Sequence, residues 1–161
     1  MVQFAAVLAA CSLTLLAATA ARSAGAEGLV KIVVLGDSLS AGLGLPAKDG
    51  FVPRLQAVLA ADGVAAEIVN AGVSGDIAAD GLARLDWSVP QGTDAVIVEL
   101  GANDMLRGLK PQLTRAALDA ILQRLTARHV TVMLCGMRAA PNLGAAYGEE
   151  FARIFPELAA K

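Results

Sequence analysis

The sequence has little of what metal sites, disulfide frameworks and nucleic-acid-binding surfaces are built from. Its 161 residues include one histidine and two cysteines, Cys11 and Cys135, which lie far apart. These three residues do not assemble a zinc site, so we expect no metal. Only 17% of the residues are charged, no basic run occurs and the net charge is -2, which argues against a nucleic-acid-binding protein. Hydrophobic residues make up 56%, enough for a buried core and too many for a disordered chain.

The long apolar run of the chain lies at its start. Phe4 to Ala21 is almost entirely Ala, Leu and Val, and small-x-small triplets occur at Ala18–Ala20 and Ala24–Ala26. Signal peptidase cleaves after such triplets, so we expect residues 1–26 to be a signal peptide, cleaved after Ala20 or Ala26. The mature protein is then periplasmic or secreted, without stable membrane insertion. A retained anchor is the alternative, because Met-Val-Gln carries no Lys or Arg and about 18 apolar residues barely span a bilayer.

The two cysteines give little further information. Leu8-Ala9-Ala10-Cys11 resembles a lipoprotein processing box, but apolar residues continue past it. Removal of the signal peptide leaves Cys135 alone within an apolar segment, where a cysteine is usually a small buried hydrophobe. We therefore expect no disulfide.

After the signal peptide, short apolar runs alternate with amphipathic segments, which predicts one α/β domain over residues 27–161. Strand and helix alternate four times, a pattern typical of a parallel sheet with helices on both faces. The predicted strands are 31–35, 65–69, 94–100 and 130–134. The predicted helices carry four stripes: Phe51, Leu55, Val58 and Leu59; Ile77, Leu82 and Leu85; Leu113, Ala117, Leu118, Ile121, Leu122 and Leu125; and Tyr147, Phe151, Ile154, Phe155 and Leu158.

Several polar residues and one proline mark the expected helix ends. Asp49 and Asp76 precede two of the stripes and are expected to open those helices. Asp104 is interpreted as a cap of the turn that follows it. Pro156 interrupts the last stripe and is expected to kink or break that helix.

Ligands of parallel α/β sheets bind beyond the carboxyl ends of the strands, so we expect chemistry in the loops that follow them. Gly36-Asp37-Ser38-Leu39-Ser40 places a serine at the start of a helix, where backbone N–H groups can stabilise an oxyanion. A serine that merely caps the helix is the alternative. Two common motifs fail: Ser40 occupies the last glycine position of Gly-x-Ser-x-Gly, and Gly42-Leu43-Gly44 lacks the third glycine of a dinucleotide loop.

The next two loops carry weaker signals when each is taken alone. In Asn70-Ala71-Gly72-Val73-Ser74-Gly75 the glycines could let the backbone approach a substrate closely, although for this loop alone a tight turn is the better explanation. In Gly101-Ala102-Asn103-Asp104 the Asn103 side chain offers an amide donor. This third loop extends to Gly108, and a fourth loop, 136–144, completes the set of strand ends.

Taken together, the three motifs resemble three of the four sequence blocks of the SGNH-hydrolase (GDSL-type) family, in order and in spacing, from Lys31 to Lys161. Gly101–Gly108 and Met137–Gly144 are most similar to its bacterial periplasmic branch of arylesterases, acyl-thioesterases and lysophospholipases. The resemblance implies a three-layer, flavodoxin-like fold and Ser38 as nucleophile. The oxyanion hole would consist of the N–H groups of Ser38 and Gly72 and the amide of Asn103. It implies no cofactor and an ester, thioester or lysophospholipid as substrate.

The family's fourth block, an Asp-x-x-His that supplies the general base and its orienting Asp, has no counterpart in this sequence. The one histidine, His129, comes just before the fourth strand and so lies at the amino edge of the sheet. A strand of about six residues at roughly 3.3 Å each puts it on the order of 20 Å from Ser38, far beyond hydrogen-bond reach. We therefore expect a C-terminally truncated, impaired enzyme that lacks the fifth strand and last helix.

Two other functions remain open on the sequence. The chain could be a non-catalytic remnant that retains an acyl-binding cleft and has lost turnover. It could also be a plain flavodoxin-like binding domain, but that interpretation leaves the agreement of three loops unexplained.

Overall fold

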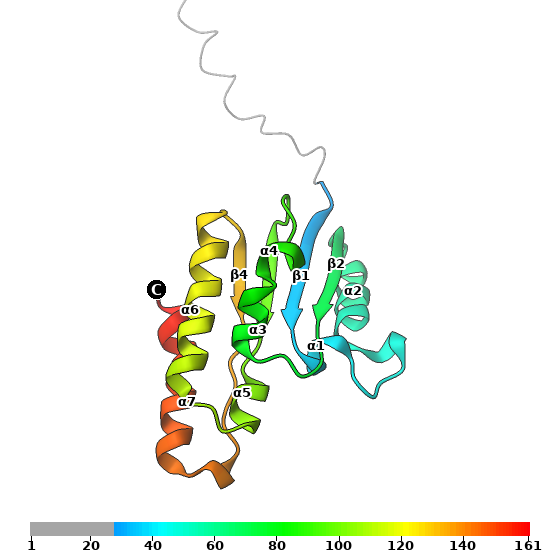
Figure 1. Cartoon of the computed structure of the whole chain (residues 1–161). Coiled ribbons are helices and arrows are strands. Elements are labelled where there is room, and N and C mark those ends of the chain that lie inside the picture. Colours follow the sequence, from blue (N-terminus) through cyan, green and yellow to red (C-terminus); the bar gives the residue numbers. More distant parts are fainter. Residues whose placement is uncertain (1–27) are drawn as a thin grey trace, which may run out of the picture.

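A computed structural model describes residues 28–161, so the predicted signal peptide lies outside the described residues. Within them, four strands form one parallel sheet in the order β2-β1-β3-β4. None of the helices there is long and apolar enough to span a bilayer. The predicted parallel α/β fold is thus confirmed (Figure 1). The strands are β1 (Val30–Gly36), β2 (Ala66–Gly72), β3 (Ala95–Glu99) and β4 (Thr131–Leu134), and the helices are α1 (Ser38–Ala41), α2 (Phe51–Ala61), α3 (Ala78–Ala83), α4 (Leu85–Ser88), α5 (Ala102–Leu106), α6 (Pro111–Ala127) and α7 (Ala145–Ala159).

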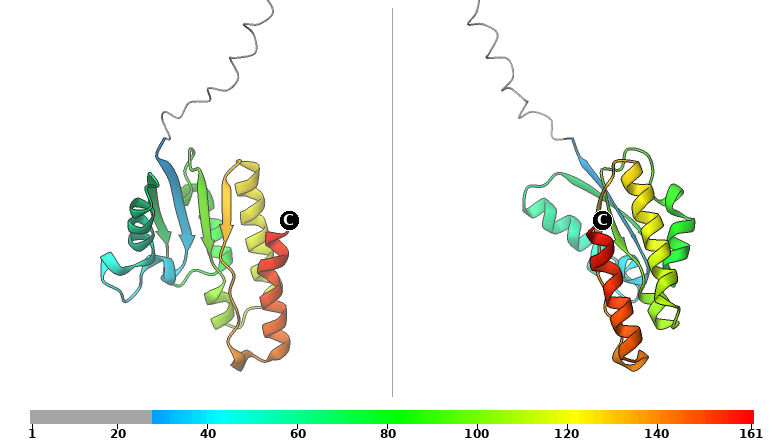
Figure 2. Two further views of the ribbon diagram at one scale, coloured as in Figure 1. Left: turned by 180° about the vertical axis from the view of Figure 1, so that it is seen from behind. Right: turned by 90° about the vertical axis from the view of Figure 1, so that its left-hand side faces the viewer.

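Helices cover the two faces of the sheet unequally. Side chains alternate along β1, so Val33 and Leu35 face a large core while Val34 faces a small one. The large core includes apolar residues of α3, α6 and α7, and α2 supplies the helical part of the small core (Figure 2). Cys135 packs at the edge of the small core as a half-buried free thiol. The predicted helices on both faces are present.

The helical stripes agree with the structure where the packing is tight. Along α7, Phe151, Ile154, Phe155 and Leu158 are all buried, as predicted. In α2 the buried face is shifted by one residue: Val52 is buried, whereas Phe51 and Val58 are exposed. The reason is that α2 contacts only the narrow small core, which Val52 and Leu55 fill.

Of the two effects predicted for Pro156, a kink or a break, the break is wrong, since α7 continues to Ala159. A proline inside a helix costs about 3 kcal/mol. Phe155 and Leu158, on either side of it, are almost fully buried, and a large apolar side chain contributes about 1.5–3 kcal/mol on burial. Packing against the large core therefore outweighs the lost helical hydrogen bond.

The strand β4 forms an edge of the sheet, and its surroundings are apolar. Met133 on β4 is 62% exposed on the small-core side. On the other side a groove of about 600 Å³ runs between β4, α6 and α7 and is lined by Leu122, Val132 and Leu134, among others. An edge strand presents unpaired N–H and C=O groups, and with apolar side chains beside it the edge favours association.

We therefore expect the purified 161-residue chain to self-associate at micromolar concentration. Met133→Lys should shift it toward monomer, because a lysine on an edge strand opposes strand pairing. Size-exclusion chromatography with light scattering measures this. Leu113→Lys is the matched control, since Leu113 is 60% exposed on α6 and should not alter association. A parent chain that is already monomeric would refute the expectation.

Candidate functional site

Three loops meet at the carboxyl edge of the sheet, the edge at which α1 and α5 also lie (Figure 1). They are the turn after β1 with Ser38, the loop after β2 from Gly72 to Ile77, and the start of α5 with Asn103. Parallel strands bring their carboxyl ends together, which is why motifs more than 60 residues apart in sequence become neighbours. Ser38 is half-buried as the first residue of α1.

Asp37 ties the serine turn to Asn103. Its carboxylate is fully buried: Oδ1 accepts a hydrogen bond from the Leu39 N–H at 3.0 Å, and Oδ2 accepts one from the Asn103 amide at 3.1 Å. The first bond caps α1, which has only four residues. The second fixes Asn103 beside the turn that carries Ser38. Sequence reasoning had assigned Asp37 no role, although its place between Gly36 and Ser38 points to this cap.

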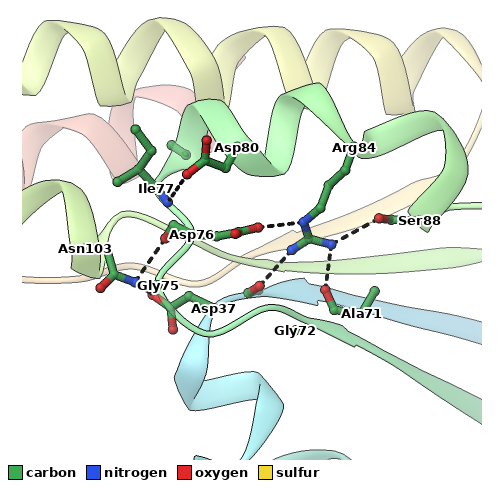
Figure 3. Close-up of polar contacts among 12 residues, drawn as sticks. Asp37, Ala71, Gly72, Gly75, Asp76, Ile77, Asp80, Arg84, Ser88 and Asn103 are labelled. Carbon is green, nitrogen blue, oxygen red and sulfur yellow. Dashed lines mark hydrogen bonds and ion pairs between the residues drawn. The ribbon is translucent and has the colours of Figure 1, made fainter.

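Two of the three predicted oxyanion donors make hydrogen bonds within the protein. The Gly72 N–H donates to Asn70 Oδ1 at 2.9 Å. The Asn103 amide nitrogen donates both to Asp37 Oδ2 and, at 3.0 Å, to the Asp76 carbonyl oxygen (Figure 3). For either group to stabilise an oxyanion, one of these bonds must be shared or exchanged.

Gly75 is a second glycine of this loop that bears on the site. It has φ +93°, a conformation that only glycine adopts readily, and its carbonyl accepts a hydrogen bond from Arg107 at 2.6 Å. Figure 3 shows Asn103 directed at the Gly75–Asp76 backbone, where its amide donates to the Asp76 carbonyl. The predicted motif contains two glycines, Gly72 and Gly75. Gly75 is the one next to a residue, Asp76, that contacts Asn103 directly.

Two of the three acidic caps predicted from the sequence, Asp76 and Asp104, have partners other than a helix end. Asp76 does not cap α3 but forms an ion pair with Arg84, Nε to Oδ2, at 2.6 Å. Asp104 is buried and does not cap its own turn: it accepts the Ala78 N–H at 2.8 Å and the Thr114 hydroxyl at 2.9 Å. Both carboxylates therefore join separate loops, because a buried charge must find strong partners wherever the fold supplies them.

Glu99, at the end of β3, is a further polar residue that sequence reasoning missed. Its Oε2 accepts a hydrogen bond from the Ser40 hydroxyl at 2.8 Å, while Oε1 is buried without a hydrogen-bond partner among the described residues. The contact lies over Gly36, where a Cβ atom would sit 2.2 Å from Ser40 Oγ. The sequence did contain a signal for this residue, because Glu99 is a charged residue at the end of an otherwise apolar strand.

Glu99 makes the free energy of unfolding depend on pH. Burial raises the pKa of this carboxyl, the Ser40 hydrogen bond opposes the rise and the charge of Asp37 adds to it. Because the folded-state pKa lies above the ordinary value of 4.5, the folded state binds this proton more tightly than the unfolded chain does. The resulting stabilisation is present at pH below 4.5 and is lost as the pH rises through the folded-state pKa.

We expect Glu99→Gln to melt at a higher temperature than the parent at pH 8, because it removes the buried charge and retains an acceptor for Ser40. The advantage should shrink as the pH falls and disappear below pH 4.5. Thermal melts at pH 8, 6 and 4 measure the difference. Glu67→Gln, which changes an exposed carboxylate on β2, should show no such trend. Equal melting temperatures of Glu99→Gln and parent at pH 8 would contradict the argument.

The structure places His129 away from these loops. It lies in the turn between α6 and β4, with φ 57°, at the edge of the sheet opposite to α1 (Figure 1). The prediction that it is too far from Ser38 to act as a base agrees with this placement. Over residues 28–161, no group of three or more His, Cys, Asp or Glu side chains is arranged to hold a metal ion.

Comparison with known proteins gives consistent matches. Residues 34–161 match the GDSL-like Lipase/Acylhydrolase family. Esterase TesA of Pseudomonas aeruginosa is 41% identical over 131 residues, which cover 81% of this chain and 65% of that protein. Thioesterase 1/protease 1/lysophospholipase L1 of Escherichia coli K12 is 40% identical over 139 residues, covering 86% and 64%. The crystal structure of AlinE4, an SGNH-hydrolase family esterase, superimposes with a TM-score of 0.81 at 44% identity, covering 84% of this chain and 74% of that one. The chain thus spans about two thirds of the length of these curated relatives.

Proposed function

Because the chain belongs to the GDSL-like lipase/acylhydrolase family, we propose that it carries the nucleophile and oxyanion loops of a serine ester hydrolase. The substrate would be a small aryl or acyl ester, a thioester or a lysophospholipid, in keeping with the names of its relatives. The observation that supports this most is the 3.1 Å hydrogen bond between Asp37 and Asn103, which links the Ser38 turn to the amide donor. With the predicted signal peptide, the protein would act in the periplasm or outside the cell.

In the proposed reaction, Ser38 Oγ attacks the substrate carbonyl carbon and a tetrahedral oxyanion forms. Donors for that oxyanion would be the Ser38 N–H, which as a first-turn amide has no intrahelical acceptor, and the Asn103 amide. The third donor comes from the loop after β2. Gly72 is the prediction from the sequence, and the Gly72–Asn70 bond favours Gly75 in its place. The bond to the leaving group then breaks, and water hydrolyses the acyl-serine.

The proton of Ser38 needs a base, which in the family is a histidine. His129 does not supply it from the opposite edge of the sheet. This observation favours a second candidate function, an acyl-binding protein that keeps the cleft without turnover. In that case the Gly72 N–H and the Asn103 amide keep their hydrogen bonds to Asn70 and Asp37 while no ligand is bound.

Covalent trapping tests the identity of the nucleophile without requiring turnover. The purified chain is incubated for hours at pH 9 with an alkyl fluorophosphonate, which phosphonylates an activated serine, and its peptides are analysed by mass spectrometry. We expect the adduct on Ser38, at a rate reduced at least ten-fold in Asn103→Ala. Ser74→Ala, in an exposed part of the neighbouring loop, is the matched control and should label normally. An adduct on a different serine, or none at all, would overturn the assignment of Ser38.

A further inference from the structure

The guanidinium of Arg84 lies beneath the loops that carry the proposed nucleophile and oxyanion donors. Arg84 closes α3 and its side chain is only 8% exposed. It donates through Nη2 to the Gly36 carbonyl at 2.9 Å and through Nη1 to the Ala71 carbonyl at 2.8 Å (Figure 3). The remaining bonds go to Ser88 Oγ at 3.0 Å and to Asp76 Oδ2 at 2.6 Å. Of these four partners, Asp76 lies in a loop of the site, and Gly36 and Ala71 lie at the ends of the strands that lead into two of the loops.

The positions of the two carbonyls make these bonds informative. Gly36 immediately precedes Asp37 and Ser38, and Ala71 immediately precedes Gly72. In the sheet, Gly36 pairs with Gly72 and Leu35 with Ala71, so one guanidinium spans the last rung between β1 and β2. The Gly36 carbonyl also accepts the Val73 N–H at 3.0 Å, which closes the connection between the two loops.

The third loop is connected through Asp76. Its carboxylate pairs with Arg84, and its backbone carbonyl accepts a hydrogen bond from the Asn103 amide. Movement of the guanidinium would therefore displace Asp76 and, with it, an acceptor that orients Asn103. A buried ion pair is often no more stabilising than apolar residues of the same volume, so stability alone does not account for a charge at this place.

On this basis we propose that Arg84 is a positioning residue: it holds the loops of Ser38, Gly72–Asp76 and Asn103 in the arrangement that binds a tetrahedral oxyanion. The inference rests on the proposed function. It also predicts that lysine does not replace arginine here. A single ammonium lacks the planar fork that reaches two carbonyls and a carboxylate in different directions.

Binding of phenylboronic acid tests this without a general base. The Ser38 Oγ–boron bond forms, the hydroxyl proton passes to the buffer, and the tetrahedral boronate anion takes the place of the oxyanion. Boron-11 NMR detects the tetrahedral species, and titration gives its dissociation constant. We expect Arg84→Lys to raise that constant at least ten-fold at a temperature where circular dichroism shows both proteins folded. Ser88→Ala, which removes the guanidinium partner that lies neither in the three loops nor at a strand end leading into them, should change it less than two-fold.

The outcomes separate the inference from the proposed function. If the tetrahedral signal in the parent chain is absent, or survives Ser38→Ala, the proposed function fails and the role of Arg84 fails with it. If the signal depends on Ser38 and Arg84→Lys binds within two-fold of the parent, only the inference is overturned. An equal loss in Ser88→Ala also overturns it. Should Arg84→Lys not fold, Asp76→Asn replaces it: it keeps the guanidinium but removes its counter-charge, and affinity equal to the parent would refute the proposal.

Discussion

The purified 161-residue chain is expected to hydrolyse p-nitrophenyl butyrate at a rate close to that of buffer alone. Ser38 and the proposed oxyanion donors lie at one edge of the sheet, and His129 lies at the other. A general base must lie within about 2.6–3.2 Å of the proton that it removes, or act through one water. Loss of a triad member leaves only roughly 10³–10⁴-fold catalysis over water, from binding and the oxyanion hole. Initial rates at pH 7 and 9, against a protein-free blank, measure this.

Supplying a base should raise the rate strongly. A chimera that joins this chain to the C-terminal segment of a related esterase with an Asp-x-x-His block is expected to gain several orders of magnitude, since general-base catalysis alone contributes about 10²–10⁴. Ser38→Ala in the chimera should abolish the gain. His129→Ala is the matched control and should leave the rate of the chimera unchanged.

Other outcomes have definite meanings. A parent chain that turns over at enzyme-like rates in a Ser38-dependent manner would show that some other group serves as the base. Glu99 would then be examined first: burial raises its pKa, and it accepts a hydrogen bond from the hydroxyl of Ser40, two residues from the proposed nucleophile Ser38. A chimera that folds but stays at background would count against Ser38 as a nucleophile.

The fold could be predicted because its signals are local. A run of β-branched residues that ends in glycine, such as Ile32 to Gly36, specifies a buried strand and the turn after it. The rule that parallel strands present their carboxyl ends at one edge then brought Ser38 and Asn103 together without any knowledge of side-chain contacts. The 3.1 Å bond through Asp37 agrees with that expectation.

The supporting residues could not be predicted in the same way, because their partners are distant in sequence. Arg84 contacts Gly36 across 48 positions, and Glu99 contacts Ser40 across 59. Asp76 shows the consequence. An aspartate before a helix indicates a cap, but here it pairs with the buried guanidinium of Arg84, since leaving that buried charge without a counter-charge would be strongly destabilising. A local sequence pattern indicates which contact a residue prefers. It does not show which competing partner the fold brings close to that residue.

Gly72→Ala is expected to lower the stability of the chain sharply, for a reason independent of any role in binding an oxyanion. A Cβ atom at Gly72 would sit 2.4 Å from the Ala41 N, 2.8 Å from the Asp37 O and 2.9 Å from the Ser40 C. All three are backbone atoms of the serine turn and α1, so no flexible side chain can move aside. Separation of the end of β2 from α1 should cost about 3 kcal/mol or more. For a domain of this size the melting temperature should fall by roughly 10 °C.

Alanine keeps the backbone N–H of residue 72, so this substitution separates packing from hydrogen-bond donation. Gly148→Ala is the matched control: in α7 a Cβ at Gly148 meets nothing within 4 Å, and alanine there should stabilise the helix by up to ~1 kcal/mol. Thermal melts of the two variants beside the parent should therefore move in opposite directions. If Gly72→Ala has the same melting temperature as the parent, α1 must be able to move away from β2 at little cost. The tight contact between the Ser38 turn and the loop after β2 would then not fix the geometry of the site.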